Sequence, residues 1–216
     1  MSLISKTPIY FGPFLVTPQE SSPHPQNPPR PSGTHTPQLL TNINNQQVFY
    51  VTPLSFALVN LKPLLPGHVL VCPLRRVPRV TDLTPSETID LFLTVRRVGR
   101  MIQRVYHGTS LNIAIQDGPE AGQTVPHVHA HIIPRRKADL EHRGGSDAIY
   151  EMMEGREGNI ARHLGEMVEE KRERERERER SRFPGVDNET REPRSEEEMM
   201  EEAVALAKEM EGEAVD

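Results

Sequence analysis

Three histidines alternate with apolar residues over His127-Val128-His129-Ala130-His131, and this alternation constrains the fold more than any other feature of the chain. Alternate side chains of a β-strand lie on opposite faces of its sheet. The pattern therefore predicts a strand whose apolar residues enter a core while three imidazoles line the opposite surface. Imidazole has an unperturbed pKa of about 6.5, so each ring can act as nucleophile, proton donor or metal ligand near neutral pH.

The histidine row has three candidate roles. A structural role without chemistry explains one histidine on a sheet face better than three in strict alternation. A metal site shared by all three is disfavoured, because the first and third positions lie about 13 Å apart on a strand while zinc ligands lie about 2.1 Å from the ion. A two-histidine site needs an Asp, Glu or Cys from elsewhere. We favour covalent catalysis, in which the middle ring attacks and its neighbours handle the flanking groups of an extended substrate.

The segment before the row predicts a loop that binds phosphate. After the apolar residues 111–115, the sequence Gln-Asp-Gly-Pro-Glu-Ala-Gly-Gln-Thr-Val at residues 116–125 is typical of a hairpin connection. Gly122 permits a close approach of main-chain N–H groups to an anion. Gln116, Gln123 and Thr124 add neutral donors beside the histidines.

These motifs resemble the histidine triad family. The order His-φ-His-φ-His-φ-φ is the signature of that family, and residues 54–60, 66–73 and 116–125 resemble its fragile histidine triad branch. The resemblance covers about residues 46–150 and returns at residues 194–199. It implies a homodimer that hydrolyses a dinucleoside polyphosphate, chiefly diadenosine triphosphate to AMP and ADP, through a covalent nucleotidyl-histidine.

The resemblance also implies a role for each site residue. His129 is the nucleophile that becomes adenylylated, His127 holds its geometry, and His131 and Gln123 contact the phosphate under attack. The implied substrate-binding residues are Asn60, His68, Gln116, Gly122, Gln123, Thr124, Val125 and His131. We expect no protein-bound cofactor and no protein-built metal site, with Mg²⁺ or Mn²⁺ associating only with the substrate phosphates.

The chemistry leaves alternatives open. Attack by a neutral ring nitrogen needs a hydrogen bond at the other nitrogen, which sets the tautomer. A nucleoside diphosphate departs without a strong general acid, since a phosphate monoester has a second pKa of about 6. The alternatives are a nucleoside phosphoramidase or nucleotidyltransferase of the same superfamily, or a dinucleotide sensor that signals through its substrate-bound complex. A sensor would bind tightly and turn over slowly.

Composition restricts partners and compartment. The chain of 216 residues has a formal net charge of -5, which provides no basic field for nucleic acid. No apolar run approaches the about 20 residues of a membrane span, and the first residues lack the apolar core of a signal peptide. Cys72 is the only cysteine, as suits a reducing compartment. We expect a cytoplasmic protein, with the nucleus as a second compartment.

The rest of the pattern predicts an α+β fold, with a five-stranded, mainly antiparallel sheet, a long packed helix and a C-terminal helix. The expected strands are residues 47–51, 55–60, 68–73, 111–116 and 125–133. Residues 84–87, Thr-Pro-Ser-Glu, form a capping box. The helical spacing after it predicts one buried face, formed by Ile89, Phe92, Val95, Val98, Ile102 and Val105.

Five parts follow along the chain. We expect an N-terminal strand in residues 1–17, a Pro-rich disordered insertion at 18–45, the catalytic core at 46–150, a charged and largely disordered segment at 151–193, and a C-terminal helix at 194–216. The alternating basic and acidic residues 171–180 make helical charge pairs nearly cancel. A second capping box at residues 195–198 opens the last helix, whose apolar face holds Met199, Ala203, Leu206 and Met210.

Overall fold

The computed structural model describes residues 9–12, 14–15, 47–155, 158–166, 169 and 194–214. The expected Pro-rich insertion at 18–45 and the charged tract at 171–180 lie outside these residues. Near the amino terminus, β1 (Tyr10–Phe11) and β2 (Phe14–Leu15) pair antiparallel as a tight hairpin. None of the described helices is long and apolar enough to cross a membrane.

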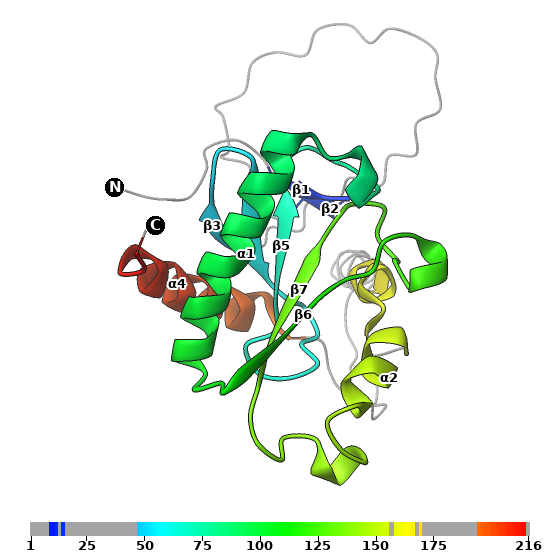
Figure 1. The fold of residues 1–216 in the computed structure, drawn as a ribbon, viewed down its shortest axis with the longest axis vertical. Helices are drawn as coiled ribbons and strands as arrows, with labels where there is room; N and C mark the ends of the chain where they lie inside the picture. The colour runs from blue at the N-terminus through cyan, green and yellow to red at the C-terminus, as the bar shows by residue number, and fades with distance from the viewer. Residues whose placement is uncertain are drawn as a thin grey trace, which may run out of the picture.

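An antiparallel sheet of five strands forms the centre of the molecule (Figure 1). Its order is β3-β4-β5-β7-β6, and each neighbouring pair is antiparallel. The strands are β3 (Val48–Val51), β4 (Ser55–Val59), β5 (Val69–Pro73), β6 (Ser110–Ile115) and β7 (Ala130–Arg135). The predicted α+β architecture and the hairpin between β6 and β7 are confirmed.

The histidine strand differs from the prediction. β7 begins at Ala130, so His127 and His129 lie in the irregular segment before it. The side chains are not on an open surface, because His127, His129 and His131 are only 0%, 1% and 2% exposed. The expectation of three rings lining a sheet surface is therefore wrong for this structure. Groups from outside the five-stranded sheet contact the rings, because Phe11 of β1 packs against His127 and His129 and the Gly12 N–H donates to His127 Nδ1 at 3.0 Å.

Helix α1 (Pro85–Val105) packs against the sheet (Figure 1). The capping box is confirmed, because the Thr84 hydroxyl accepts from the Glu87 N–H and the Glu87 carboxylate accepts from the Thr84 N–H. The predicted buried face is correct for Val95, Val98 and Ile102, and Val105 is partly buried. It is wrong in the first turns, where Ile89 and Phe92 are 62% and 47% exposed. Leu91, four residues before Val95, is buried in the core instead. Ile89 and Phe92 therefore form an exposed apolar strip on the other side of the helix.

Helix α4 (Glu196–Glu211) packs beside β3 and α1. Its capping box at Ser195 is confirmed, and all four predicted apolar residues are buried. Arg104 of α1 pairs with Glu209 of α4 at 2.5 Å, and the Tyr106 hydroxyl donates to Glu202 at 2.5 Å. The last helix thus completes the core of the same domain.

The packed region extends past the predicted boundary at residue 150. Helix α2 (Ala148–Glu154) crosses that boundary, and residues 160–166 are also helical. Ile160 and Leu164, one helical turn apart, are buried in the main core. Their packing partners come from other elements. The charged residues around them therefore did not indicate that this segment packs on the core.

Candidate active site

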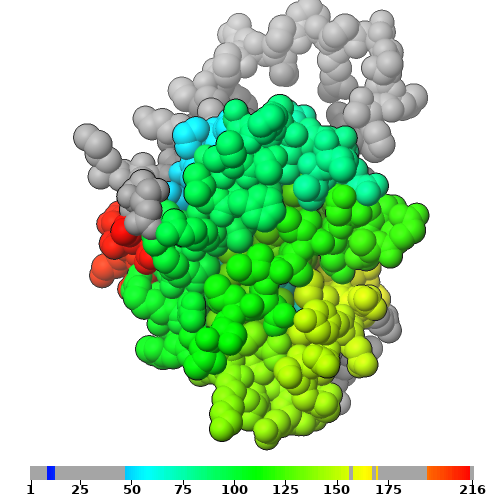
Figure 2. Space-filling view, in the orientation of Figure 1, coloured from blue at the N-terminus to red at the C-terminus, as the bar shows by residue number. Residues whose placement is uncertain are grey.

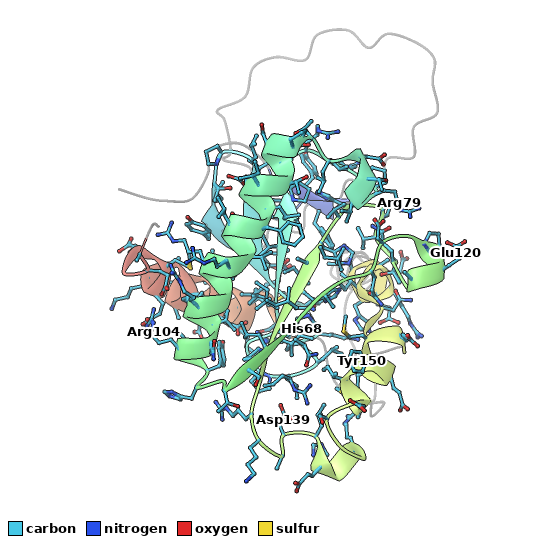
Figure 3. All side chains as sticks on the ribbon, viewed as in Figure 1. His68, Arg79, Arg104, Glu120, Asp139 and Tyr150 are labelled. Atoms are coloured by element: carbon cyan, nitrogen blue, oxygen red, sulfur yellow. The ribbon has the colours of Figure 1, made fainter. Side chains whose placement is uncertain are left out.

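The histidines meet where β7 begins, beside the end of β5. The ring centroids of His129 and His131 lie 5.1 Å apart, and those of His131 and His68 also lie 5.1 Å apart. Phe11 of β1 packs with its ring centroid 5.2 Å from that of His129. Figure 3 places His68 near the middle of the sheet, below the two loops that carry Arg79, after β5, and Glu120, between β6 and β7. The structure therefore gathers four buried histidines: His131 from β7, His127 and His129 from the segment before it, and His68 from the residue before β5.

His129 has one ring nitrogen engaged by the backbone and one available. Its Nδ1 lies 2.6 Å from the carbonyl oxygen of His127, so Nδ1–H is the donor and the proton stays on that nitrogen. Within the described residues nothing forms a hydrogen bond with its Nε2. Burial lowers the pKa of His129, which keeps the ring neutral near pH 7. A neutral imidazole with a fixed tautomer and an available lone pair is competent for nucleophilic attack.

His127 uses both ring nitrogens for contacts inside the protein. Its Nε2–H donates to the carbonyl of Pro73 at 2.8 Å, and its Nδ1 accepts from the Gly12 N–H at 3.0 Å. Burial lowers the pKa of His127 to about 4, so these contacts belong to the neutral ring. With both nitrogens occupied, His127 fixes the backbone carbonyl that orients His129.

A directed chain of hydrogen bonds ends at His131. The Leu64 N–H donates to His68 Nδ1 at 3.2 Å, so His68 carries its proton on Nε2 and donates to His131 Nδ1 at 2.9 Å. His131 then carries its proton on Nε2, an atom that is buried without a partner among the described residues. Burial lowers the pKa of His68 to about 3 and that of His131 well below its usual range. An unpaired buried donor is costly, and this one is suited to a phosphate oxygen.

Asn60 belongs to the same cluster. Its Nδ2 lies 3.4 Å from each ring nitrogen of His68, and its Oδ1 accepts from the Lys62 N–H at 3.2 Å. The side chain is buried at the end of β4. The structure thus brings Asn60 to His68, while its contact with the nucleoside stays a prediction.

The Gln123 side chain is engaged within the loop itself. Its Oε1 accepts from the Gly118 N–H at 2.9 Å, and its Nε2 donates to the carbonyl of Pro78 at 2.9 Å. The amide therefore fastens the β6–β7 connection to the segment after β5. The contact of Gln123 with the phosphate under attack stays a prediction, and in this structure both polar atoms of the amide are engaged inside the protein.

The other loop residues make packing and backbone contacts of their own. Gly122 has a φ of +85°, and a Cβ there would lie 2.5 Å from Gln116 Nε2. Glycine is thus required for the Gln116 amide to pack on this main chain. The Thr124 hydroxyl accepts from the Ala161 N–H at 3.3 Å, and Val125 is buried beneath Gly12. Residues 160–166 consequently form one side of the site.

Sequence reasoning missed several groups that hold the site. Gly12 and Pro73 act through backbone atoms, which leave no signal in residue type. Asp117 accepts from the Val80 N–H at 2.8 Å and pairs with Arg79 at 3.2 Å. The sequence pointed to Asp117 only through its position next to Gln116 in the predicted phosphate-binding loop. In the part of the chain that is described, no group of three or more His, Cys, Asp or Glu residues is arranged to hold a metal ion.

Known proteins share this fold and these motifs. The HIT domain family model matches residues 41–138. The chain is 52% identical over 165 residues to the asymmetrical bis(5'-nucleosyl)-tetraphosphatase of Schizosaccharomyces pombe, covering 73% of this chain and 85% of that protein. It is 54% identical over 122 residues to the bifunctional bis(5'-adenosyl)-triphosphatase/adenylylsulfatase FHIT of Arabidopsis thaliana, covering 56% of this chain and 66%, just under two thirds, of that protein.

A solved structure gives the same relationship. The crystal structure of the Caenorhabditis elegans NitFhit protein matches with a TM-score of 0.50 at 38% identity, covering 76% of this chain and 27% of that one. The chain therefore belongs to the HIT domain family, the histidine triad proteins. Within that family it falls in the fragile histidine triad branch.

Proposed function

We propose that this protein hydrolyses diadenosine 5',5'''-P1,P3-triphosphate to AMP and ADP through a covalent nucleotidyl-histidine. The observation that carries the proposal is the pairing of two atoms: the available Nε2 of His129 and the unpartnered Nε2–H of His131. The first can attack phosphorus while the second donates to an oxygen of the same phosphate. Relatives named as bis(5'-adenosyl)-triphosphatases and as a bis(5'-nucleosyl)-tetraphosphatase support the substrate class.

In the first step, His129 Nε2 attacks the α-phosphorus and the bond from phosphorus to the bridging oxygen breaks. ADP leaves with that oxygen. The adenylylated ring becomes a cation, because Nδ1 keeps its proton while Nε2 bonds to phosphorus. The carbonyl of His127, 2.6 Å from Nδ1, accepts a stronger hydrogen bond from the charged ring than from the neutral one. This carbonyl therefore favours the covalent state.

In the second step, water attacks the phosphorus, the P–N bond breaks and AMP leaves. The neutral ring is restored. In this proposal Gln116, Thr124 and the backbone of Gly122 and Val125 hold phosphate and ribose, with Asn60 toward the nucleoside. Mg²⁺ or Mn²⁺ would accompany the substrate phosphates, since hard cations prefer oxygen ligands.

A second candidate is the longer substrate. The S. pombe relative is named an asymmetrical tetraphosphatase, which favours testing diadenosine tetraphosphate, with AMP and ATP as products. The experiment is product analysis by chromatography with both dinucleotides and with adenosine 5'-phosphoramidate. We expect repeated turnovers and AMP plus ADP from the triphosphate. Tight binding without turnover would favour the sensor, and cleavage of the phosphoramidate alone would favour the phosphoramidase.

We also propose a homodimer through α1 and the edge strand β6. Ile89, Phe92 and Leu93 of α1 are 62%, 47% and 53% exposed, and Ile113 of β6 is 49% exposed. No described strand pairs with the outer edge of β6. An apolar helix face beside an unpaired sheet edge is typical of a self-complementary interface. Figure 2 shows this face, crossed by α1 in green and covered by no other coloured element.

The proposed compartment is the cytoplasm, with the nucleus second. The argument is the single cysteine, Cys72, which is buried as a free thiol. Burial raises the pKa of the Cys72 thiol, so the group is unreactive. Fractionation of cells expressing the tagged protein tests the compartment.

A further inference from the structure

The segment that leaves β5 carries three arginines, and one of them has no partner among the described residues. Arg75 pairs with Glu87 at 2.7 Å, and Arg79 pairs with Asp117 at 3.2 Å. Arg76 is exposed and forms no hydrogen bond or ion pair with any residue that the structure describes. Its guanidinium is therefore available to an anion from outside.

Backbone contacts hold Arg76 beside the catalytic histidines. Before it, the carbonyl of Pro73 accepts from His127 Nε2–H at 2.8 Å. After it, the carbonyl of Val77 accepts from the Val128 N–H at 2.7 Å. Arg76 is thus bracketed by two bonds to consecutive residues of the histidine segment. These two hydrogen bonds fix the position of the Arg76 backbone relative to the histidine segment.

The charge of Arg76 acts at the site. Burial is the main cause of the lowered pKa of His127, and the positive charge of Arg76 adds to it. The buried histidines themselves are neutral near pH 7, because burial lowers the pKa of each. They do not offset the negative charge of a polyphosphate, whereas Arg76 can.

We propose that Arg76 binds the distal phosphates of the substrate and the diphosphate that leaves. This inference rests on the proposed function. Cleavage moves negative charge onto the bridging oxygen of the leaving group, and a guanidinium can form two parallel hydrogen bonds to phosphate oxygens. Charge stabilised as it develops lowers the barrier to the step. Arg76 is then a residue that selects substrates whose leaving group carries phosphate.

The test compares two leaving groups. Diadenosine triphosphate releases ADP, while adenosine 5'-(4-nitrophenyl phosphate) releases a phenolate without phosphate. For Arg76→Met we expect kcat/KM to fall about tenfold with the dinucleotide and to stay within about twofold of the parent with the ester. Arg76→Lys keeps the charge and should recover most of the loss.

The matched control is Lys137→Met. Lys137 is exposed and lies two residues past the end of β7. Its replacement by methionine removes one positive charge, as Arg76→Met does. It should leave both substrates unaffected. Parent-like cleavage of the dinucleotide by Arg76→Met would overturn the inference. An equal loss on both substrates would also overturn it, because that result indicates a distorted site.

A binding experiment separates this inference from the proposed function. Calorimetric titration with ADP and AMP needs no turnover. Arg76→Met should weaken ADP binding about tenfold while leaving AMP binding unchanged. If the parent protein binds ADP but cleaves no dinucleotide, the proposed function fails while Arg76 is still tested. Equal ADP affinity in the parent and Arg76→Met would refute the role of Arg76.

Discussion

His68 Nε2 lies 2.9 Å from His131 Nδ1, and the direction of this hydrogen bond is set by the backbone. The Leu64 N–H occupies the other nitrogen of His68 and can only donate. The proton between the two rings therefore belongs to His68. A main-chain amide outside the active site thus decides that His131 presents a donor, rather than a lone pair, to the substrate.

The nucleophile assignment gives the first prediction. His129→Ala should lower kcat by at least about a thousandfold while the Kd for diadenosine triphosphate changes only a few-fold, because the covalent step needs Nε2 and ground-state binding does not. His127→Ala and His131→Ala should be milder. His142→Ala, at an exposed histidine, serves as the control. Residual activity of His129→Ala within about tenfold of the parent would contradict the assignment.

The second prediction concerns stability and pH. The folded-state pKa values of His68 and His127 are lowered to about 3 and about 4, whereas an unfolded histidine titrates near about 6.5. As pH falls below that value, the unfolded chain binds protons first. The contribution of these histidines to the free energy of unfolding is therefore fully present above about pH 6.5. Below that pH, each such histidine lowers the free energy of unfolding by about 1.4 kcal/mol for every unit that the pH falls.

Urea unfolding at pH 7.5, 6.5 and 5.5 measures this loss. The free energy of unfolding should decrease between pH 6.5 and 5.5 more steeply than between 7.5 and 6.5. His127→Gln should decline less steeply, since one buried imidazole has gone. Stability that stays constant or increases on acidification would refute buried neutral histidines.

Local motifs of this chain could be predicted from the sequence, whereas contacts between distant segments could not. Both capping boxes and the hairpin between β6 and β7 could be predicted, because they follow from local spacing. The burial of the triad could not, since His127 depends on Gly12, 115 residues away. Gly12 contributes only a backbone N–H to that contact, and what requires glycine at this position is the left-handed φ of +56° and the nearby Val125, not His127. Long-range backbone contacts of this kind leave no pattern in one sequence.

The helix face illustrates a second limit. Apolar residues at Ile89 and Phe92 fit the helical period as well as Leu91 does, so periodicity alone cannot say which strip faces the sheet. A strip that binds a second copy carries the same signal as a core strip. The site residue Gln123 has a related ambiguity, since an amide suits a phosphate contact and an internal hydrogen bond equally.

The third prediction uses two glycines with left-handed backbones. Gly122 and Gly144 have φ of +85° and +98°, so alanine strains both, by about 1 to 2 kcal/mol. Only at Gly122 would the new Cβ meet a site residue, Gln116; at Gly144 nothing lies within 4 Å. Both variants should melt at lower temperature, but kcat/KM should fall only for Gly122→Ala. Equal activities of the two variants would remove Gln116 from substrate binding.

The fourth prediction tests the proposed dimer. Phe92→Glu places a charge in the exposed apolar strip of α1 and should produce monomers, because a buried unpaired carboxylate opposes association. Val204→Glu on α4 is the control, since Val204 is similarly exposed at 57% but lies outside that strip. Sedimentation should give twice the chain mass for the parent and for the control. A monomeric parent at micromolar concentration, or a dimeric Phe92→Glu, would rule out this interface.

The last prediction concerns metals, and it follows from where the ring protons lie. His127 uses both nitrogens within the protein, and the outward nitrogen of His131 carries a proton. Of the three triad rings, only that of His129 then offers a lone pair, at Nε2, whereas zinc takes about four ligands. Elemental analysis of the purified protein should therefore find no stoichiometric zinc, and EDTA should act only through cations on the substrate phosphates. One zinc per chain would require the ring of His131 to be turned, or to lose its proton at Nε2. The hydrogen bond between His68 and His131 would then have a different direction from the one that the Leu64 N–H imposes.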